Sequence, residues 1–294
     1  MASLKELKNR INSVKSTQKI TKAMQMVAAA KLRRAQEAAE NARPYAEKIA
    51  AVMANLSGAM TGPGAPRMLV GTGRSEVYFL VVATADRGLC GGFNTNIVRL
   101  ARERITELVR EGKTVKIMTV GKKGFEQLKR LHAEKIVERI ELRDVKHVDS
   151  SVAGRIGAAI RARFEAGEFD VCEVISSEFV NVMTQKPQRQ TLIPASEAID
   201  EDVARPDLKG AIYDYEPDEE SILETLLPRY VDTVILTALL ENGAGEMGAR
   251  MAAMDSATRN AGELIDKLNL EYNRTRQAKI TTELIEIIAG AEAV

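Results

Sequence analysis

The first 56 residues, MASLKELKNRINSVKSTQKITKAMQMVAAAKLRRAQEAAENARPYAEKIAAVMANL (Met1–Leu56), decide the fold, because their apolar side chains recur at alternating steps of three and four. The repeat begins with Leu4, Leu7, Ile11 and Val14. It continues in the same phase through Ala28, Leu32, Ala35, Ala39, Ala42, Ala46, Ile49, Met53 and Leu56. This spacing is typical of a coiled-coil seam that lasts several heptads. We therefore predict one helix about 80 Å long, at about 1.5 Å per residue.

Polar residues mark the start and the interior of this helix. Ser3 followed by Glu6 has the spacing of a capping box, so the helix is expected to begin there. Three polar residues interrupt the apolar seam: Gln18, Thr21 and Gln25.

The other end of the chain carries a matching repeat. Its members are Met247, Met251, Met254, Thr258, Ala261, Ile265, Leu268 and Tyr272. Pro217 suits the first position of a helix, so this second helix is expected to begin there. Pro228 and the cluster Gly243, Gly245 and Gly248 leave two possibilities open. One helix could end there and another begin, or the glycines could let two backbones approach closely.

The middle of the chain changes period. A Gly- and Pro-rich stretch at residues 57–75 predicts a linker. Continuous apolar runs that suit buried strands then alternate with segments of helical spacing. The predicted strands are EVYFLVVATAD, KTVKIMTVG, FDVCEVISSEFVNV and RQTLIPA, and the predicted helices are NTNIVRLARERITELVREG and SSVAGRIGAAIRARFEAGE. This order predicts an α/β domain with a largely parallel sheet.

The fold class is therefore α+α/β: a long antiparallel coiled coil of the N- and C-terminal helices with an inserted Rossmann-like α/β domain. The expected parts are residues 1–57 for the first helix, 76–211 for the α/β domain and 217–294 for the second helix. The chain ends KITTELIEIIAGAEAV, which lacks a basic last turn and is mostly apolar. We expect these last residues to protrude as an apolar tip.

Composition and motifs argue against a catalytic or metal site. The turn GLCGGFN at Gly88–Asn94 lies where a phosphate would bind, but its spacing fits neither the dinucleotide fingerprint nor the P-loop. The histidines His132 and His147 have no ligand partners at metal spacing. Cys90 and Cys172 are expected to be buried thiols. No catalytic residue, metal or cofactor is therefore predicted, and no apolar run is long enough to span a membrane.

The charge distribution is more informative than the net charge of +1. Only Glu6 opposes a run of basic residues in the first helix: Lys5, Lys8, Arg10, Lys15, Lys19, Lys22, Lys31, Arg33 and Arg34. Such a helix can present a solvated face, or it can bind nucleic acid, anionic lipid or an acidic protein surface.

Three segments together resemble one family. STQKITKAMQMVAAAKLRRAQ, VATADRGLCGGFNTNI and RQAKITTELIEIIAGAEA are similar to the best-known segments of the gamma subunits of rotary proton-translocating ATP synthases. The resemblance covers the whole chain in the order coil, α/β insert, coil. The chloroplast members carry an inserted loop with two cysteines, which this sequence lacks, so the resemblance favours a bacterial type.

The resemblance implies a function and a set of partners. Members of the family are non-catalytic rotating shafts that couple proton flow to ATP synthesis or hydrolysis. One copy stands inside a ring of three alpha and three beta subunits, and its foot meets the epsilon subunit and the membrane c-ring. No nucleic acid is bound and no segment enters the membrane. The expected location is the cytoplasmic side of the cell inner membrane, as a peripheral part of the complex.

The resemblance also assigns roles to individual residues by matching positions. Contacts with loops of the beta subunits are expected at Met24, Arg250, Arg276, Gln277, Thr281 and Glu283. The apolar axle tip is expected to include Leu284, Ile285, Ile287 and Ile288. Contacts of the foot with epsilon or the c-ring are expected at Tyr213 and Tyr215.

Two other functions remain possible from the residues alone. One is a dinucleotide-dependent enzyme that uses the α/β insert. The other is a basic coiled-coil adaptor that binds nucleic acid or an acidic partner. The missing phosphate motif disfavours the first, and the lack of stacking aromatic residues disfavours nucleic acid.

Overall fold

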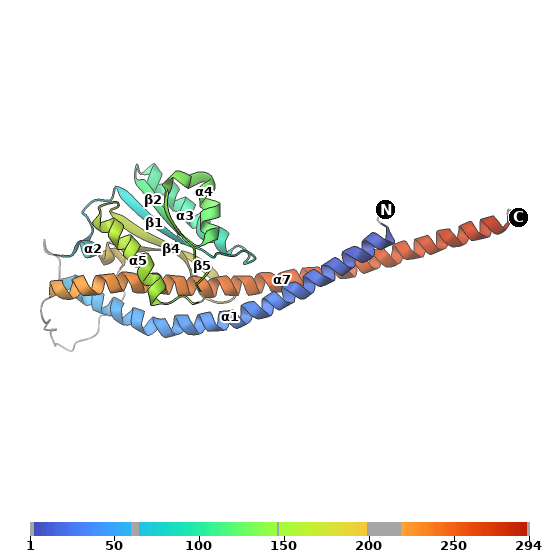
Figure 1. The fold of residues 1–294 in the computed structure, drawn as a ribbon, viewed down its shortest axis with the longest axis horizontal. Coiled ribbons are helices and arrows are strands. Elements are labelled where there is room, and N and C mark those ends of the chain that lie inside the picture. Colours follow the sequence, from blue (N-terminus) through green and yellow to red (C-terminus); the bar gives the residue numbers. More distant parts are fainter. Residues whose placement is uncertain (1–2, 60–64, 146, 199–218, 293–294) are drawn as a thin grey trace. The chain divides into compact units, whose positions relative to one another are not determined.

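The computed structural model describes residues 3–59, 65–145, 147–198 and 219–292 (Figure 1). The chain divides into two compact units. The paired-helix unit comprises Met1–Ala29 and Arg250–Val294, and the sheet unit comprises Ala30–Ala249. Two long helices, α1 (Leu4–Ala59) and α7 (Glu219–Glu292), contribute to both units.

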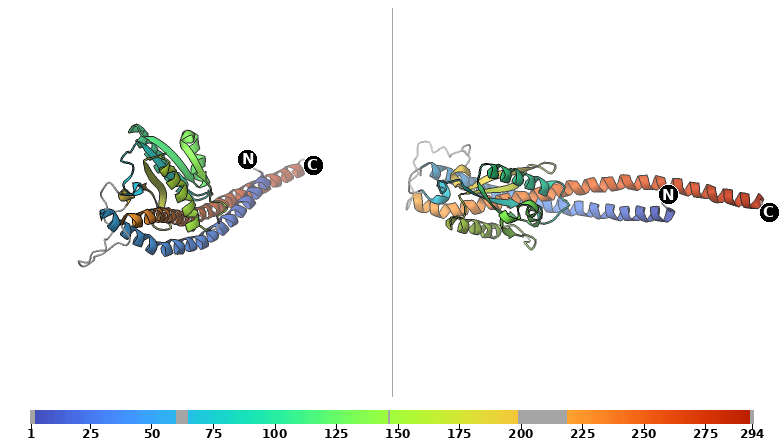
Figure 2. Two further views of the ribbon diagram at one scale, coloured as in Figure 1. Left: turned by 60° about the vertical axis from the view of Figure 1, so that its left-hand side comes forward. Right: turned by 90° about the horizontal axis from the view of Figure 1, so that it is seen from above.

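In the paired-helix unit, α1 and α7 run side by side in opposite directions (Figure 2). Leu7 and Ile11 of α1 pack with Leu268 of α7. Further along α1, Gln25 bonds to Asp255, so α7 numbers fall as α1 numbers rise. The predicted antiparallel pairing of the terminal helices is therefore confirmed.

The start of α1 has the predicted capping box. The Glu6 backbone N–H donates to Oγ of Ser3 at 3.2 Å, and the Ser3 N–H donates to Oε2 of Glu6 at 2.8 Å. These reciprocal bonds satisfy amides that the first helical turn leaves without intrahelical partners.

The sheet unit is built on a mixed sheet of five strands in the order β3-β2-β1-β4-β5. Three of the four neighbouring pairs are parallel, and the fourth pair, β4 with β5, is antiparallel. The strands are β1 (Val77–Ala83), β2 (Thr114–Val120), β3 (Ile136–Ile140), β4 (Val171–Phe179) and β5 (Gln185–Ile193). The predicted Rossmann-like insert with a largely parallel sheet is thus confirmed.

Each face of the sheet packs against helices in a separate core. On one face, α3 (Phe93–Arg110) buries Ile97 and Ile105 against the strands. On the other face, α5 (Ser150–Glu165) and α7 share a core with the sheet that includes Ile156 of α5 and Val231 of α7. The α/β insert is therefore not a free lobe, because part of α7 completes its core.

Shorter elements complete the sheet unit. They are α2 (Arg67–Val70), α4 (Lys122–His132), a 3-10 turn (Ala133–Lys135) and α6 (Ala195–Ala198). The sequence reasoning did not single out α4 or β3. Both are short, and β3 alternates half-buried and exposed residues in place of a continuous apolar run. The pattern of β3 therefore gives a weaker signal than a continuous apolar run, whereas α4 is strongly amphipathic and its helical period was missed.

Helix α7 continues through Pro228 and the glycine cluster without a break. A Cβ at Gly245 would lie 2.9 Å from Cε2 of Phe93, and one at Gly248 would lie 3.3 Å from Cε2 of Phe179. Of the two possibilities left by the sequence, close approach is therefore correct for Gly245 and Gly248, which let α7 lie close to the start of α3 and the end of β4. Gly243 has no neighbour within 4 Å of a Cβ position.

Within the sheet unit, α1 and α7 also pair in opposite directions. Met53 and Leu56 of α1 share a buried cluster with Leu223 and Leu227 of α7. The expected boundaries at 1–57, 76–211 and 217–294 stay a prediction, because parts of the intervening segments lie outside the described residues.

Candidate functional site

The paired helices carry a polar layer where the sequence interrupts its apolar seam. Oγ1 of Thr21 lies 2.8 Å from Oγ1 of Thr258. Gln25 donates from Nε2 to Oδ1 of Asp255 at 2.9 Å, and Gln18 donates to the carbonyl oxygen of Thr258 at 3.5 Å. Directional bonds of this kind specify register between helices, which apolar packing alone specifies less well.

Four of the predicted contact residues lie close together on α7. Arg276, Gln277, Thr281 and Glu283 are all exposed. Thr281 donates to the carbonyl oxygen of Gln277 at 3.0 Å, which is a bond within the helix. Oε1 of Glu283 lies 3.6 Å from Nζ of Lys279, one helical turn away. The side chains of Arg276 and Gln277 are thus presented to solvent, as a contact with another subunit requires.

The other two predicted contact residues lie in different surroundings. Met24 is half-buried on α1. Arg250 is buried, with 9% of its surface exposed. The structure therefore does not bring all of the predicted contacts into one exposed patch.

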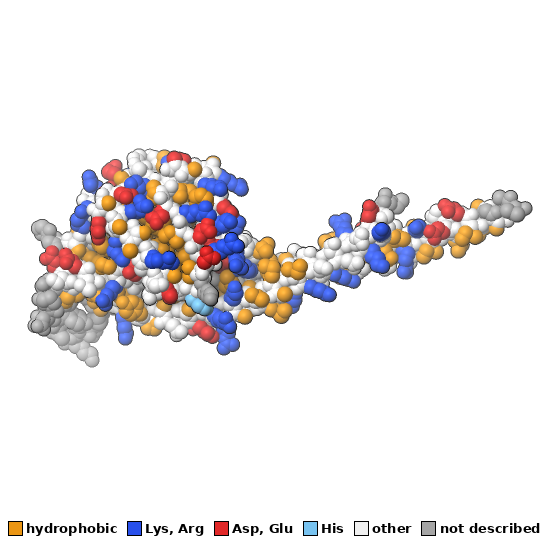
Figure 3. Space-filling view, in the orientation of Figure 1, with side chains coloured by type: hydrophobic (Ala, Val, Ile, Leu, Met, Phe, Trp, Pro, Cys, Tyr) orange, Lys and Arg blue, Asp and Glu red, His pale blue; other side chains and the backbone are white. Residues whose placement is uncertain are grey.

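The end of α7 is apolar and exposed. It extends beyond the start of α1, so no neighbouring helix of this unit covers it (Figure 1). Residues 276–289 are all exposed, and the apolar ones are visible in the space-filling view (Figure 3). The exposed fractions are 55% for Leu284, 59% for Ile285, 71% for Ile287 and 50% for Ile288. A run of apolar side chains left in water is typical of a surface that another protein covers.

Helix α1 presents both charge and apolar surface. Its basic residues in this unit are all exposed: Lys5, Lys8, Arg10, Lys15, Lys19 and Lys22. Between and beyond them, Ile20, Met26 and Val27 are more than half exposed, at 59%, 60% and 56%. The sequence analysis missed these three residues as surface groups. Their exposure could have been predicted, because they are apolar but fall outside the repeat of three and four residues that forms the seam.

The predicted foot contacts cannot be placed. Tyr213 and Tyr215 lie outside the described residues.

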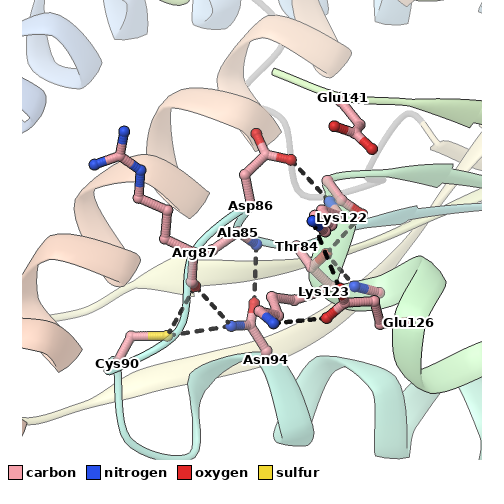
Figure 4. A network of polar contacts seen from close by, with 12 residues as sticks. Thr84, Ala85, Asp86, Arg87, Cys90, Asn94, Lys122, Lys123, Glu126 and Glu141 are labelled. Carbon is pink, nitrogen blue, oxygen red and sulfur yellow. Dashed lines mark hydrogen bonds and ion pairs between the residues drawn. The ribbon is translucent and has the colours of Figure 1, made fainter. Parts of the chain in front are cut away.

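The glycine-rich turn after β1 is braced by its own chain (Figure 4). Asn94 is buried, and its Oδ1 accepts from the backbone N–H of Ala85 at 2.9 Å. Its Nδ2 donates to the carbonyl oxygen of Arg87 at 3.4 Å and lies 3.2 Å from Sγ of Cys90. Leu89 adopts a φ of 62°, in the left-handed region. The turn is thus a rigid loop held by a buried amide.

The first amides of α4 are also bonded within the protein. The Lys122 N–H donates to Oδ1 of Asp86 at 2.8 Å, and the Gly124 N–H donates to Oγ1 of Thr84 at 2.8 Å. A phosphate group at a helix start needs such amides as donors. Gly121 has a φ of 97°, and a Cβ there would lie 2.1 Å from the carbonyl oxygen of Thr84, so this glycine serves a close backbone contact.

Metal sites, membrane spans and exposed thiols are the remaining possibilities in the described ranges. No group of three or more His, Cys, Asp or Glu residues there could hold a metal ion. None of the described helices combines the length and apolar character of a membrane span. Both cysteines are buried, as expected, and burial raises the pKa of the Cys172 thiol.

The paired terminal helices with an inserted α/β unit match one family. The sequence profile described as ATP synthase matches residues 3–294. A protein of Maricaulis maris named ATP synthase gamma chain is 72% identical over 295 residues, covering 100% of both chains. This chain belongs to the ATP synthase gamma chain family. The predicted family is therefore confirmed, and the chain is a bacterial-type gamma subunit of ATP synthase, a non-catalytic subunit.

Other relatives and structures agree with this assignment. The ATP synthase gamma chain of Rhizobium johnstonii is 62% identical over 296 residues and is covered completely. In fold, the chain is similar to one from the Euglena gracilis mitochondrial ATP synthase, with a TM-score of 0.69, 20% identity and coverage of 99% of this chain and 94% of that one. It is also similar to one from the central stalk and c-ring of the Tetrahymena thermophila enzyme, with a TM-score of 0.60, 24% identity and coverage of 81% and 99%.

Proposed function

We propose that this gamma chain is the rotating shaft that mechanically couples proton flow through a membrane rotor ring to ATP synthesis and hydrolysis at a catalytic alpha/beta ring. The observation that carries the proposal is the end of α7, where apolar residues are exposed along a helix that extends beyond its partner. An apolar tip can turn within an apolar collar, because apolar contacts are non-directional and similar at every angle. Hydrogen bonds there would favour particular angles.

The charged residues of the shaft are proposed to set preferred angles. Arg276 and Gln277, with Thr281 and Glu283, present polar groups to loops of the beta subunits next to the apolar tip. A charge pair at about 4 Å is worth about 4 kcal/mol at an effective dielectric of about 20, and less once salt screens it. Contacts of this size bias one angular state without locking it. Met24 and Arg250 are proposed to contribute from positions nearer the seam.

The proposed assembly contains three alpha and three beta subunits with one copy of this chain. The epsilon subunit and the c-ring are proposed to bind at the foot, with Tyr213 and Tyr215 among the contacts. The chain would then lie at the cytoplasmic side of the inner membrane as a peripheral component. Support for this comes from the family assignment and from relatives that match over their full length.

The basic face of α1 is proposed to meet acidic protein surface. Its exposed lysines are interspersed with the exposed apolar residues Ile20, Met26 and Val27, a mixture that suits a protein partner better than a phosphate backbone. A basic adaptor that binds nucleic acid would instead show salt-sensitive binding to duplex DNA.

Native mass spectrometry of the chain mixed with alpha and beta subunits from the same source tests the proposal. We expect a particle with three alpha, three beta and one gamma subunit. If the chain stays free, or binds in another ratio, the proposal that it is the rotating shaft is refuted. A parallel titration with duplex DNA at low and moderate salt separates the adaptor function, which alone predicts a complex there.

A further inference from the structure

In the sheet unit, helix α5 meets α7 through a side chain seated in a notch between glycines. A Cβ built at Gly157 of α5 would lie 1.9 Å from Oδ1 of Asp232 and 3.1 Å from its Cγ. A Cβ at Gly154, one turn earlier, would lie 3.7 Å from Oδ2 of the same carboxylate. Asp232 therefore occupies the volume that a larger side chain at residue 157 would need.

Arg161 closes the notch from the following turn of α5. Its Nη1 donates to Oδ1 of Asp232 at 2.5 Å and to the carbonyl oxygen of Pro228 at 3.2 Å. Pro228 precedes Asp232 by one turn of α7, so a single guanidinium group contacts two successive turns of that helix. The side chains of Arg161 and Asp232 are 17% and 30% exposed, so water screens the pair only in part.

The rest of this contact is apolar. Val152, Ile156 and Ile160 of α5 lie in one core with Val231 and Ile235 of α7. Burial of apolar surface holds the two helices together, but it is non-directional and depends mainly on the area covered. The notch and the charged hydrogen bonds are directional, so they specify which turn of α7 faces which turn of α5.

We propose that Asp232, held in the Gly154–Gly157 notch and bonded to Arg161, is a positioning residue that fixes the register of α7 against α5 and transmits torque between these two helices. The proposal rests on the rotary function proposed above. If α7 turned or slid against α5, the carboxylate would leave the notch and Arg161 would lose both acceptors. This contact therefore resists slip of α7 against α5.

A reversible disulfide between α5 and α7, in place of the ion pair, tests the proposal directly. The variant carries both Gly157→Cys and Asp232→Cys. Its reduced form lacks the ion pair between Arg161 and Asp232, and oxidation joins α5 to α7 by a disulfide instead. A Cβ at Gly157 would lie 3.1 Å from Cγ of Asp232, and the Cβ of residue 232 is one bond from that atom, so the two Cβ atoms are close enough for such a bond. The native cysteines Cys90 and Cys172 are buried, so they do not compete for oxidation. Both states come from one preparation of the assembled ATP synthase in membrane vesicles.

The readout is the ratio of ATP-driven proton pumping to ATP hydrolysis, with hydrolysis measured in the presence of a protonophore. Since a hydrogen bond to a charged group shifts an equilibrium by roughly tenfold or more, we expect the ratio to fall about twofold or more in the reduced state and to recover on oxidation. An equal ratio in both states, a lower ratio after oxidation, or a disulfide that does not form would overturn the proposal. Wild-type vesicles that hydrolyse ATP without pumping would instead count against the proposed rotary function.

A second set of variants separates the effect of the side chain's fit in the notch from the effect of losing the ion pair. Asp232→Ala and Gly157→Ala should each lower the pumping ratio, whereas the double variant should recover part of it, because the new methyl group fills the space that the carboxylate vacated. Arg163→Ala is the matched control on the same helix, since Arg163 bonds Glu138 and Glu168 and not α7. The proposal would be overturned if the pumping ratio fell equally in the control, or if the pumping ratio of the double variant were no higher than that of either single variant.

Discussion

The carboxylate of Glu173, on the interior strand β4, accepts two hydrogen bonds from Arg104 of α3, at 2.7 Å from Nη2 and 3.0 Å from Nε. The Glu173 side chain is 4% exposed and that of Arg104 is 15% exposed. The guanidinium also lies 5.3 Å from the ring centroid of Tyr78 on β1. This pair joins α3 to two neighbouring strands across the face of the sheet.

Replacing one partner of this pair should destabilise the sheet unit strongly. In the Glu173→Ala variant, Arg104 would stay largely buried with only the exposed Glu107 as a partner, at 3.2 Å from its Nη1. Removing one member of a buried pair typically costs about 3–5 kcal/mol. We expect a fall in the free energy of unfolding of that size, measured by urea denaturation. Lys113→Ala provides the control, because its partner Glu76 is 66% exposed and such a pair contributes about 0–1 kcal/mol. Equal losses in the two variants would contradict the assignment.

The acid stability of the sheet unit should depend on Asp170. Its side chain is 8% exposed and accepts from Oγ1 of Thr72 at 2.7 Å and from the backbone N–H groups of Glu76 and Val77. Burial opposes the charge, but these hydrogen bonds prevail and hold the pKa of Asp170 below its ordinary value of 3.8. Its stabilising effect is therefore full above the ordinary pKa and is lost as the pH falls through the lower folded-state pKa.

The Asp170→Asn variant tests this dependence. At neutral pH we expect it to lose about 1–3 kcal/mol of stability, because the amide cannot accept all three bonds as well. The difference from wild type should shrink as the pH falls below 4. Unfolding curves at neutral pH and at several acidic values measure it, and a difference that stays constant with pH would contradict the role of the charge.

Much of the fold could be predicted because its signals are long and local. The seams of α1 and α7 and the apolar strands repeat over many residues, so a single departure does not hide them. The glycine cluster on α7 was ambiguous for a different reason. Only the partners, Phe93 and Phe179, show that Gly245 and Gly248 are contact positions within an unbroken helix.

The candidate site was predictable only where a family motif or a run of one residue type marked it. The apolar residues at the end of α7 follow one another with only Glu286 between them, so their exposure could be expected. Ile20, Met26 and Val27 are scattered among basic residues, and their exposure depends on which side of α1 faces α7. The notch around Asp232 was not foreseeable, because it joins residues that are 75 positions apart (from 157 to 232) across two helices.

The buried amide of Asn94 should be essential to the turn after β1. The Asn94→Ala variant removes the acceptor of the Ala85 N–H and the donor to the Arg87 carbonyl oxygen. Each buried group left unsatisfied costs about 1–3 kcal/mol. We expect a loss of at least that size in thermal or urea unfolding, with faster hydrogen exchange at Ala85. Unchanged exchange there would show that the amide does not brace the turn.

The polar layer between α1 and α7 should specify register more than stability. Thr21→Val and Thr258→Val each remove one hydroxyl of the pair at 2.8 Å. In either single variant the remaining hydroxyl still donates to a carbonyl oxygen of its own helix, Gln18 for Thr21 and Met254 for Thr258. Each single variant is therefore expected to lose about 0.5–1.5 kcal/mol from the contact between the helices, and the double variant should lose less than the sum. Urea unfolding of the wild type and the three variants forms a double-mutant cycle. Strictly additive losses would mean that the two hydroxyls do not interact.

The exposed end of α7 should matter to assembly and not to the stability of the free chain. Ile287 is 71% exposed, so Ile287→Ser should change the unfolding free energy by no more than about 0.5 kcal/mol. In the assembled complex the same change removes an apolar contact, and truncation after Ala289 removes more. We expect both variants to lower the yield of complex with alpha and beta subunits, measured by native mass spectrometry, more than they lower ATP hydrolysis per assembled complex.

Leu131→Ser on α4, where the side chain is 66% exposed, is the matched control and should leave assembly unchanged. Normal assembly with lost hydrolysis in the α7 variants would instead assign the tip a part in turnover and refute the apolar bearing.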